Sequence, residues 1–389
     1  MDVDAIDRRA RLRRLVDETV AAMDPARRVA QALAAIDLGR RAAVGIAVGK
    51  AARAMARGAR GIGRGLVIAP GPGAVPPGWE LMVASHPRPD ERSERAGRAA
   101  LAWAAAIDPG AVMIALISGG ASALAAVPAP GETLASKRAA VDAAMARGLP
   151  IAALNALRTR LSAIKGGQLA RTCPAPVVTL VASDVVGDEP AIVGSGPTVG
   201  AWTTRLDRGP IAIDELPIVD GRRDAVIVVA GVGELARTVT AILAREAPVV
   251  CAPAPLVGDV AEVAARLTAI ARDGGHGAWV ASGEATIAVG LAPGQGGRAQ
   301  HTALLVARAL AGAPGWACLC VGSDGVDGTG PAAGAIVDGD TWAALAAAGI
   351  DGDRALAARD SGTALAAIGA AVVTGPTGVN HADLVVVVR

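Results

Sequence analysis

The chain opens with a helical pattern of apolar and polar positions, over residues 5–36. Apolar side chains recur every three or four residues, which is typical of helices that bury one face. Pro25 falls inside this pattern, and proline is favoured in the first turn of a helix, where its missing N–H is not needed. Asp24 precedes it as a candidate cap. The pattern therefore predicts two helices, the second beginning at Pro25.

Short apolar runs then alternate with amphipathic stretches as far as residue 181. The run at 111–117 is apolar throughout, as expected of a parallel strand that is buried on both faces. This alternation is typical of an α/β fold, and it predicts a Rossmann-like, doubly wound and mostly parallel sheet. The predicted strands are 42–48, 66–69, 81–84, 111–117 and 177–181, and the predicted helices are 51–59, 90–106, 134–146 and 151–164.

Residues 200–223 break this rhythm with Pro210, Pro217 and many charges. A chain of this length exceeds one ordinary core, since a domain averages ~150 residues. We therefore predict an N-terminal domain over 1–220 and a smaller C-terminal α/β domain over 221–389. The second series has predicted strands at 224–230, 248–252, 277–281, 316–321 and 384–388, predicted helices at 234–247, 259–273 and 299–312, and a helix near Trp342.

Composition and charge exclude several classes of protein. Apolar residues make up 52% of the chain, which favours a globular fold over a disordered one. No apolar run approaches the ~18 residues of a membrane span, and Met1–Arg14 lacks the apolar region of a secretory signal. The net charge of +2 predicts no strong field for nucleic acid. We expect a cytoplasmic enzyme with small-molecule partners, and a homodimer is compatible with the sequence.

The chain contains four cysteines and neither phenylalanine nor tyrosine. No two cysteines form a CxxC pair, but Cys318 and Cys320 would face the same side of a strand. They are either buried free thiols or a metal or redox pair. Without phenylalanine and tyrosine, the core has to pack with aliphatic side chains and six tryptophans, and an adenine ring cannot stack on either missing residue.

A glycine-rich segment follows the predicted strand at 111–117. Ser118, Gly119, Gly120 and Ser122 come where ligands bind in open α/β sheets, just past the carboxyl end of a strand. Glycine lets the backbone approach a phosphate, and the next helix would offer free N–H groups. A plain strand-to-helix turn explains the segment equally well.

A second glycine pattern favours a nicotinamide dinucleotide. Residues 231–236 read GVGELA, a GxGxxA motif after a predicted strand and at the start of a predicted helix. The acidic residue expected ~20 positions later is missing, because the next strand ends in Cys251 and Ala252. No GxxxxGK[ST], GxSxG or HExxH motif is present, so neither a P-loop enzyme nor a zinc hydrolase is supported.

Two acidic loops are candidates for magnesium binding. Asp184 and Asp188 follow the strand at 177–181, and Asp324 follows the strand at 316–321. Carboxylates in flexible, glycine-containing loops suit Mg²⁺, which takes one or two protein carboxylates together with phosphate oxygens. Either loop taken alone is equally typical of an Asp/Gly turn.

Lysine is scarce, being limited to Lys50, Lys137 and Lys165. Lys50 comes at the start of a predicted helix, where the helix dipole opposes a cation and a bound anion would resolve the conflict. Arg298 also opens a predicted helix and suits a bidentate grip on carboxylate or phosphate. Lys165 lies at a predicted helix end, where the dipole favours it.

Taken together, these segments resemble the class II glycerate kinases, the MOFRL family. The resemblance runs from Lys50 to the C-terminus. It is carried by GKAARAMA (49–56), SHPRPDERSERAG (85–97), SGGASAL (118–124), NALRTRLSAIKGGQLA (155–170), SDVVGDEPAIVGSGPT (183–198), SGEATI (282–287), GGRAQ (296–300), GSDGVDGTGPAAGAIVD (322–338) and VVTGPTGVN (372–380). It implies a Rossmann-like N-terminal domain, a smaller C-terminal α/β domain and an active site in the cleft between them. The implied reaction is ATP-dependent phosphorylation of D-glycerate to 2-phosphoglycerate with Mg²⁺.

The resemblance also implies roles for individual residues. Lys50 and Arg298 would neutralise phosphate and the substrate carboxylate, and Asp184 would act as base. The Ser118–Ser122 segment would cradle phosphate or substrate. The remaining implied residues are Asn155, Arg158, Lys165 and Glu284 for substrate or phosphate, and Asp188 and Asp324 for the metal. Phosphoryl transfer depends on positioning and charge neutralisation, so this inventory fits the reaction.

The sequence departs from the family pattern at four places, one of which is a segment after Thr198 that is shorter than usual. GGRAQH stands at 296–301 where the family reads GGRNQE, GVG stands at 231–233 where it reads GDN, and no aromatic stretch follows Ser361. Two alternatives therefore stay open beside the kinase. One is a NAD(P)-dependent hydroxypyruvate reductase, and the other is a catalytically weakened protein that binds a nucleotide or hydroxy acid.

Overall fold

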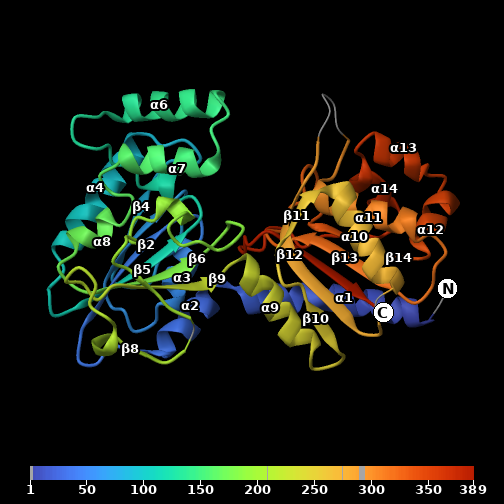
Figure 1. Cartoon of the computed structure of the whole chain (residues 1–389), viewed down its shortest axis with the longest axis horizontal. Helices are drawn as coiled ribbons and strands as arrows, with labels where there is room; N and C mark the ends of the chain where they lie inside the picture. The colour runs from blue at the N-terminus through green and yellow to red at the C-terminus, as the bar shows by residue number, and fades with distance from the viewer. Residues whose placement is uncertain (1–2, 208, 274, 289–293) are drawn as a thin grey trace. The chain divides into compact units, whose positions relative to one another are not determined.

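The computed structural model describes residues 3–207, 209–273, 275–288 and 294–389, and it divides into two units. One unit comprises Asp24–Ala230, and the other comprises the segment ending at Met23 together with Gly231–Arg389 (Figure 1). The predicted boundary at 220/221 thus lies ten residues before the observed one. The N-terminal helix belongs to the C-terminal unit, which local periodicity could not indicate. In the described residues no helix is long and apolar enough to cross a membrane.

The N-terminal unit is built on a seven-stranded sheet in the order β4-β3-β2-β5-β6-β9-β7. Every strand pair in this sheet is parallel, which confirms the predicted doubly wound architecture. Its strands are β2 (Ala43–Val48), β3 (Gly65–Ala69), β4 (Trp79–Val83), β5 (Val112–Ser118), β6 (Val177–Ala182), β7 (Thr204–Arg205) and β9 (Ala225–Ala230), and β1 (Ile36–Asp37) pairs separately with β8 (Ile211–Ala212).

The helices of this unit agree with the sequence pattern at most positions. The predicted helix at 134–146 is observed with the same bounds, and the one at 151–164 ends early, at Arg160. Figure 1 shows α6 and α7 side by side. The helices are α2 (Pro25–Ala34), α3 (Ala52–Gly58), α4 (Glu91–Ala105), α5 (Ala121–Leu124), α6 (Leu134–Ala146), α7 (Ile151–Arg160) and α8 (Gln168–Thr172), with short 3-10 turns at Val193–Ser195 and Ile213–Glu215.

Tryptophan and glycine together compensate for the missing phenylalanine and tyrosine in this core. The Trp79 ring is buried and donates from Nε1 to the carbonyl oxygen of Ile62 at 2.9 Å. A Cβ atom on Gly45 or Gly65 would lie 2.2 or 2.3 Å from that ring, so only glycine leaves room for it. One large ring over two bare strand positions fills a volume that several small side chains would otherwise share.

Asp224 fastens the start of β9 to its surroundings. Its carboxylate is 1% exposed and accepts hydrogen bonds from Arg222 Nε at 2.6 Å, Trp202 Nε1 at 2.8 Å and the Val177 amide at 3.0 Å. A buried carboxylate is tolerated when it is paired and hydrogen-bonded in this way. The network therefore joins three segments that are far apart in the sequence.

The C-terminal unit holds a second seven-stranded sheet, in the order β10-β12-β16-β13-β14-β15, with β11 also paired to β12. Unlike the first sheet it is mixed, because β16 runs antiparallel between β12 and β13. Its strands are β10 (Val249–Cys251), β11 (Leu256–Asp259), β12 (Ala278–Thr286), β13 (Ala317–Gly322), β14 (Gly334–Asp338), β15 (Ala371–Val372) and β16 (Asp383–Val388).

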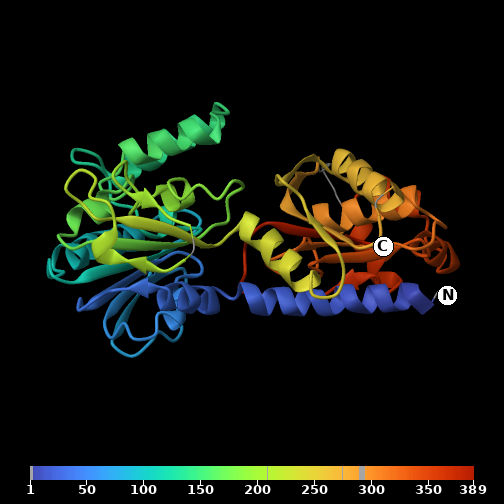
Figure 2. The same cartoon turned by 60° about the horizontal axis from the view of Figure 1, so that its bottom comes forward.

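Helices of this unit lie on both sides of its sheet. The long N-terminal helix α1 runs beside α9 and contacts β13 and β14, as Figures 1 and 2 show in blue. The helix α11 packs on β13 and β14 and carries the residues of the GGRAQH segment. The helices are α1 (Val3–Met23), α9 (Val232–Leu243), α10 (Val260–Asp273), α11 (Arg298–Ala309), α12 (Thr341–Ala347), α13 (Gly352–Ala357) and α14 (Ser361–Ala367).

The GVGELA segment does not lie in a dinucleotide-binding unit. A dinucleotide fingerprint needs its two flanking strands in one sheet, joined by the crossover helix. Here β9 pairs with β6 and β7 in the first sheet, whereas β10 pairs with β12 in the second. Gly231 is therefore a connection between two units, and local sequence could not reveal this because the strand–glycine–helix order is the same in both cases.

Candidate active site

The glycine segment after β5 is tied to the residues that follow β2. Both segments lie at carboxyl ends of neighbouring parallel strands, so the fold brings them together. Ser118 is buried, and its Oγ accepts a hydrogen bond from the Ala51 amide at 3.1 Å. The Lys50 amide donates to the Gly119 carbonyl oxygen at 2.8 Å. Lys50 is thereby fixed beside the predicted phosphate loop.

Asp184 faces this loop from the end of the neighbouring strand β6. A Cβ atom on Gly119 would lie 1.9 Å from Asp184 Oδ2, so the approach requires glycine. The Lys50 ammonium lies 3.8 Å from the same carboxylate oxygen. A cation and a carboxylate thus stand together at one edge of the sheet.

His86 lies on the other side of this loop. Gly120 has a φ of 84°, a conformation that favours glycine, and a Cβ atom there would lie 3.0 Å from both the His86 ring and Lys50 Cγ. Burial, followed by the charge of Lys50, lowers the pKa of His86, and Asp184 opposes this shift. His86 is consequently neutral at pH 7.

A basic pocket of about 260 Å³ continues from Gly120 and Ser122. Lys165 lies in it almost completely buried, and its ammonium donates to Ser122 Oγ. Arg158 Nη1 donates to Asn155 Oδ1 at 3.3 Å. Burial lowers the pKa of Arg158, and burial followed by neighbouring positive charge lowers that of Lys165 well below its usual range. The pocket therefore gathers several basic side chains, and their burial and mutual repulsion disfavour the charged forms until an anion offsets them.

Asp188 lies further along the segment that follows β6. It is 8% exposed with a φ of 50°, and its carbonyl oxygen accepts from Arg205 Nη2 at 3.4 Å. Within the described ranges, no three His, Cys, Asp or Glu side chains gather as a metal site. A role for Asp188 in metal binding stays a prediction.

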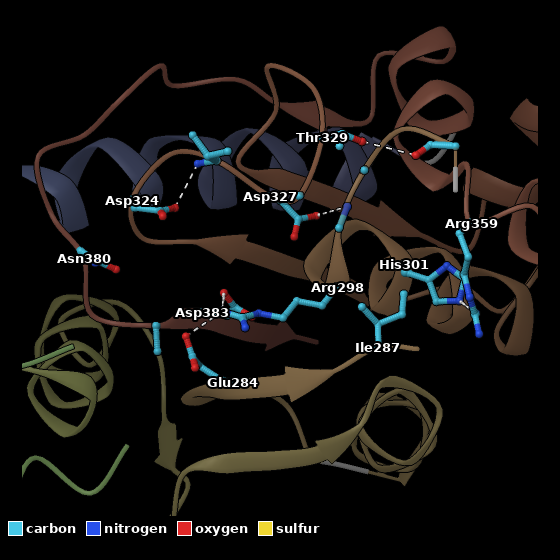
Figure 3. A pocket seen from close by; sticks show the side chains of 16 residues that line it. Glu284, Ile287, Arg298, His301, Asp324, Asp327, Thr329, Arg359, Asn380 and Asp383 are labelled. Atoms are coloured by element: carbon cyan, nitrogen blue, oxygen red, sulfur yellow. Dashed lines mark hydrogen bonds and ion pairs between the residues drawn. The ribbon is translucent and has the colours of Figure 1, made fainter. Parts of the chain in front are cut away.

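The C-terminal unit contains its own pocket, of about 440 Å³, at the start of α11 (Figure 3). Figure 3 shows Arg298 pointing toward Asp383 and Glu284. Arg298 donates from Nε to Asp383 Oδ2 at 2.6 Å, from Nη2 to Asp383 Oδ1 at 3.2 Å, and from Nη2 to Glu284 Oε1 at 2.8 Å. This bidentate grip on one carboxylate and single bond to another fix the guanidinium.

The Arg298 pair is partly removed from water. Asp383 is 8% exposed, and burial raises its pKa to about 6, although its bonds to Arg298 oppose the shift. Burial also disfavours the charge on Arg298, but the hydrogen bonds and charges of Asp383 and Glu284 outweigh it and raise the pKa of Arg298. Both members are thus ionised at pH 7.

Asp327 holds the first turn of α11 in place. Its buried carboxylate accepts from the amides of Gln300 at 2.7 Å, Ala299 at 3.0 Å and Gly297 at 3.2 Å. These donors have no partner inside the helix, so a carboxylate from a distant loop satisfies them. Burial raises the pKa of Asp327, and the three amides oppose that rise. Arg298 is positioned as a result.

His301 stands where the family motif has glutamate, and its ring makes two contacts with distant side chains. It is 2% exposed, with Nδ1 2.9 Å from Ser361 Oγ and Nε2 2.6 Å from Arg359 Nη1. Burial, then the charge of Arg359, lowers the pKa of His301 to about 4. A neutral ring accepts from Arg359 through Nε2, so Nδ1 carries the proton and donates to Ser361.

Asp324 lines the same C-terminal pocket and is exposed. Its Oδ1 accepts from the Val326 amide at 3.0 Å, an arrangement that fixes the loop. Asn380 lines the pocket as well. An exposed carboxylate beside an arginine suits a cation bound together with a phosphate.

Apart from Asp188, the predicted residues therefore fall into three groups. Ser118, Gly119, Gly120, Lys50 and Asp184 meet at one loop of the N-terminal unit. Ser122, Arg158 and Lys165 line the adjoining basic pocket, and Asn155 accepts a hydrogen bond from Arg158. Arg298, Glu284 and Asp324 line the C-terminal pocket.

Sequence reasoning missed several residues that the fold places in these sites. They are His86, Lys137, Asp327, Arg359 and Asp383. The scarcity of lysine was a signal for Lys137, and the His-Pro segment was a signal for His86. Asp383 had none, because it reads as the start of an ordinary strand.

Comparison with known families finds two matches, one in the N-terminal part of the chain and one in the C-terminal part. Residues 11–214 match the family described as a domain of unknown function, DUF4147, and residues 277–383 match the MOFRL family. The two matched ranges together span most of both units.

Several known proteins are similar over nearly their full length. A protein of Agrobacterium vitis with the provisional name hydroxypyruvate reductase is 38% identical, over 96% of this chain and 92% of its own. The D-glycerate 2-kinase of Thermotoga maritima is 32% identical over 88% and 89% of the two chains. The glycerate 2-kinase of Pyrococcus horikoshii is 30% identical over 96% of each. The crystal structure of the Thermotoga maritima glycerate kinase superposes with a TM-score of 0.85 and 28% identity, covering 99% of both chains.

Proposed function

The chain belongs to the class II glycerate kinase family, and on that premise we propose that it is a glycerate 2-kinase, an enzyme that transfers the γ-phosphoryl group of ATP to the 2-hydroxyl of D-glycerate. The observation that carries this proposal is the pairing of Lys50 with Asp184 at a glycine loop that opens into a basic pocket. A phosphoryl acceptor needs a base for its hydroxyl proton and positive charge for the transferred group.

The acceptor binds, in this proposal, along the glycine loop of the N-terminal unit. Asp184 accepts the proton of the 2-hydroxyl, and Lys50 neutralises charge that develops on the transferred phosphoryl group. Gly119 permits the close approach of Asp184, while the Ser118 side chain holds the Lys50 segment. His86, being neutral, is a second group that can donate or accept a proton at this loop.

The nucleotide binds, in this proposal, to the pocket of the C-terminal unit. Its volume of about 440 Å³ lies in the range of ordinary small-molecule sites. Arg298 is fixed by Asp383 and Glu284 and presents a guanidinium edge suited to phosphate. Asp324 is an exposed carboxylate and fits a single protein ligand for Mg²⁺. When bound, Mg²⁺ would neutralise negative charge on the phosphate oxygens. It would thereby offset the repulsion between the phosphates and the carboxylates of this pocket.

The test is glycerate-dependent ADP formation by the full chain. ADP release from ATP and Mg²⁺ is measured with and without D-glycerate, and phosphorus NMR locates the new phosphate. We expect phosphate on the 2-hydroxyl. Lys50→Met should abolish turnover with little change in thermal stability, and Arg57→Met, which removes an exposed charge from the helix that follows Lys50, should leave turnover unchanged. No turnover from the folded wild-type chain would refute the proposal.

A hydroxypyruvate reductase is the second candidate, since the Agrobacterium vitis relative carries that name. The placement of β9 and β10 in different sheets argues against the dinucleotide site that this activity would need. Titration with NADH decides between the two activities. A change of NADH fluorescence on mixing, together with oxidation of NADH that depends on hydroxypyruvate, would favour the reductase. We expect neither.

A cytoplasmic location follows from the proposed use of ATP, and we retain it as a proposal. Homodimerisation is likewise a proposal, tested by light scattering of the full chain. A mass near 38.4 kDa would contradict it.

A further inference from the structure

Two lysines lie buried in the basic pocket of the N-terminal unit. Lys137 comes from α6 and Lys165 from the segment after α7, and their side chains are 4% and 3% exposed. Both line the same cavity of about 260 Å³. Removing an ammonium group from water is unfavourable unless an opposite charge and hydrogen bonds offset the loss.

The protein itself offers these two ammonium groups little compensation. Lys165 donates to Ser122 Oγ. Lys137 Nζ reaches only the Val127 carbonyl oxygen, at 3.4 Å, and that oxygen also accepts from Ser162 Oγ at 3.0 Å and the Ala163 amide at 3.1 Å. Neither lysine has a carboxylate partner within the part of the chain that the structure describes.

The charges around the cavity add to the positive excess. The charged and titratable groups that face Lys137 come from its own helix, from α7 and from the segments before α4 and after α7. They are Arg88, Arg138, Asp142, Arg158, Lys165 and His86. Among these described residues only Asp142 is acidic, and it pairs with Arg88 at 2.6 Å. The cavity is therefore built for an anion.

We propose that Lys137 and Lys165, with Arg158, form a subsite for the carboxylate of the acceptor, and that Lys137 is a substrate-binding residue. The ligand class is a small hydroxy carboxylate, and neutral polyols are excluded. The identity of the ligand as the acceptor rests on the proposed function, whereas anion binding rests on the pocket alone. Each ammonium group has three N–H donors, and the two oxygens of a carboxylate can accept several hydrogen bonds from them.

The geometry favours the carboxylate over the transferred phosphoryl group in this subsite. Gly120 lines the cavity and also lies next to Lys50, since a Cβ atom on it would lie 3.0 Å from Lys50 Cγ. Lys50 and Asp184 are already engaged with the hydroxyl and the phosphoryl group in the proposed reaction. The opposite end of a short hydroxy acid then faces Lys137 and Lys165.

The same burial makes the subsite sensitive to pH. Burial lowers the pKa of Lys137 to about 8. In the empty pocket Lys137 is therefore charged at pH 7 and largely neutral at pH 9, so an anion that needs this charge binds more weakly at the higher pH. An arginine at this position stays charged throughout. The arginine variant therefore separates a binding role from a purely structural one.

The experiment is calorimetric titration of the full chain with D-glycerate, without nucleotide, at pH 7 and pH 9. Glycerol serves as the neutral probe and inorganic phosphate as the competing anion. We expect D-glycerate to bind and glycerol not to bind. Lys137→Met should weaken D-glycerate binding at pH 7 by about tenfold or more, with a smaller further loss at pH 9 than wild type shows. Lys137→Arg should bind within a few-fold of wild type at pH 7 and decline less than wild type at pH 9, because only the contribution of Lys165, whose pKa is also lowered, remains.

A matched control comes from the end of the same helix. Arg147 caps α6, is exposed and lies outside the cavity lining, so Arg147→Met should bind D-glycerate as wild type does. Wild-type affinity in Lys137→Met, or equal binding of glycerol, would overturn the proposal. Tighter, Lys137-dependent binding of phosphate would replace the carboxylate assignment with a phosphoryl site.

Two further comparisons test the subsite if Lys137→Met does not fold or if the chain is not a kinase. If Lys137→Met does not fold, the pH dependence of wild type against Lys137→Arg still decides, because identical alkaline declines would sink the idea. Lys137-dependent binding of D-glycerate without turnover would refute the kinase and leave the subsite standing. Turnover with an unchanged KM for D-glycerate in Lys137→Met would support the kinase and refute the subsite.

Discussion

Arg298→Met separates the structural role of Arg298 from its proposed role in phosphoryl transfer. The variant removes the bonds to Asp383 at 2.6 and 3.2 Å and to Glu284 at 2.8 Å, while methionine retains much of the apolar stem. Asp383, only 8% exposed, then loses its cation. Leaving a buried charge without its partner typically destabilises a protein by about 3–5 kcal/mol.

Proton uptake limits this loss, and it makes the loss depend on pH. The pKa of Asp383 is about 6 even with Arg298 present, and losing Arg298 raises it further. Below that pKa the carboxyl group binds a proton and no uncompensated charge remains. We therefore expect a loss of about 3 kcal/mol at pH 7.5 and a clearly smaller one at pH 5.5.

Urea unfolding of the full chain, followed by tryptophan fluorescence and by circular dichroism at both pH values, measures the loss. The double variant Arg298→Met/Asp383→Asn leaves no buried carboxylate unpaired, because Glu284, the other partner of Arg298, is partly exposed, so most of the lost stability should return. Turnover should not return, because Arg298 is still absent. A single variant that loses less than 1 kcal/mol at pH 7.5, or a double variant no more stable than the single, would refute the reasoning.

Three further predictions test other parts of the molecule. Asp184→Asn should lower kcat by about 10²–10⁴ with little change in the KM for ATP, and an unchanged kcat in steady-state assays would remove Asp184 as the base. His301 has its pKa lowered from 6.5 to about 4, so wild type should lose about 3 kcal/mol of stability as pH falls through that window. His301→Gln should lack this loss in urea unfolding at pH 7 and pH 4, and equal losses would contradict the assignment. Asp224→Ala should destabilise the N-terminal unit by about 3–5 kcal/mol, seen as a lower Tm, whereas the exposed Glu215→Ala should not; equal Tm values would mean that the buried network contributes little.

Local chemistry explains why several residues of the candidate site could be expected near one another from the sequence. Glycines 119 and 120 were predicted to lie at a ligand-binding loop, and the parallel order of β2, β5 and β6 brings Lys50 and Asp184 to that loop. The carboxyl ends of neighbouring parallel strands lie at one edge of a sheet. Once the strands were recognised, the neighbourhood of these residues followed.

Departures from the family motif were read only in part. The histidine at position 301 left a weakened protein open as an alternative, and the fold shows what His301 contacts, namely Arg359 and Ser361. Those partners lie 58 and 60 residues away in the sequence. Contacts of this kind depend on which distant loop packs against α11, and a motif comparison cannot contain that information.

The amino-acid sequence by itself determined the local elements. Apolar spacing, caps and glycine positions fixed α4, α6 and the parallel strands of the first unit, because each depends on neighbours a few residues away. Tertiary structure alone decided that α1 joins the C-terminal unit, that β9 and β10 lie in different sheets, and that β16 runs antiparallel between β12 and β13. It also decided that Asp383 meets Arg298 across 85 residues of chain. Such choices depend on which distant surfaces bury each other, and the same local pattern is compatible with several of them.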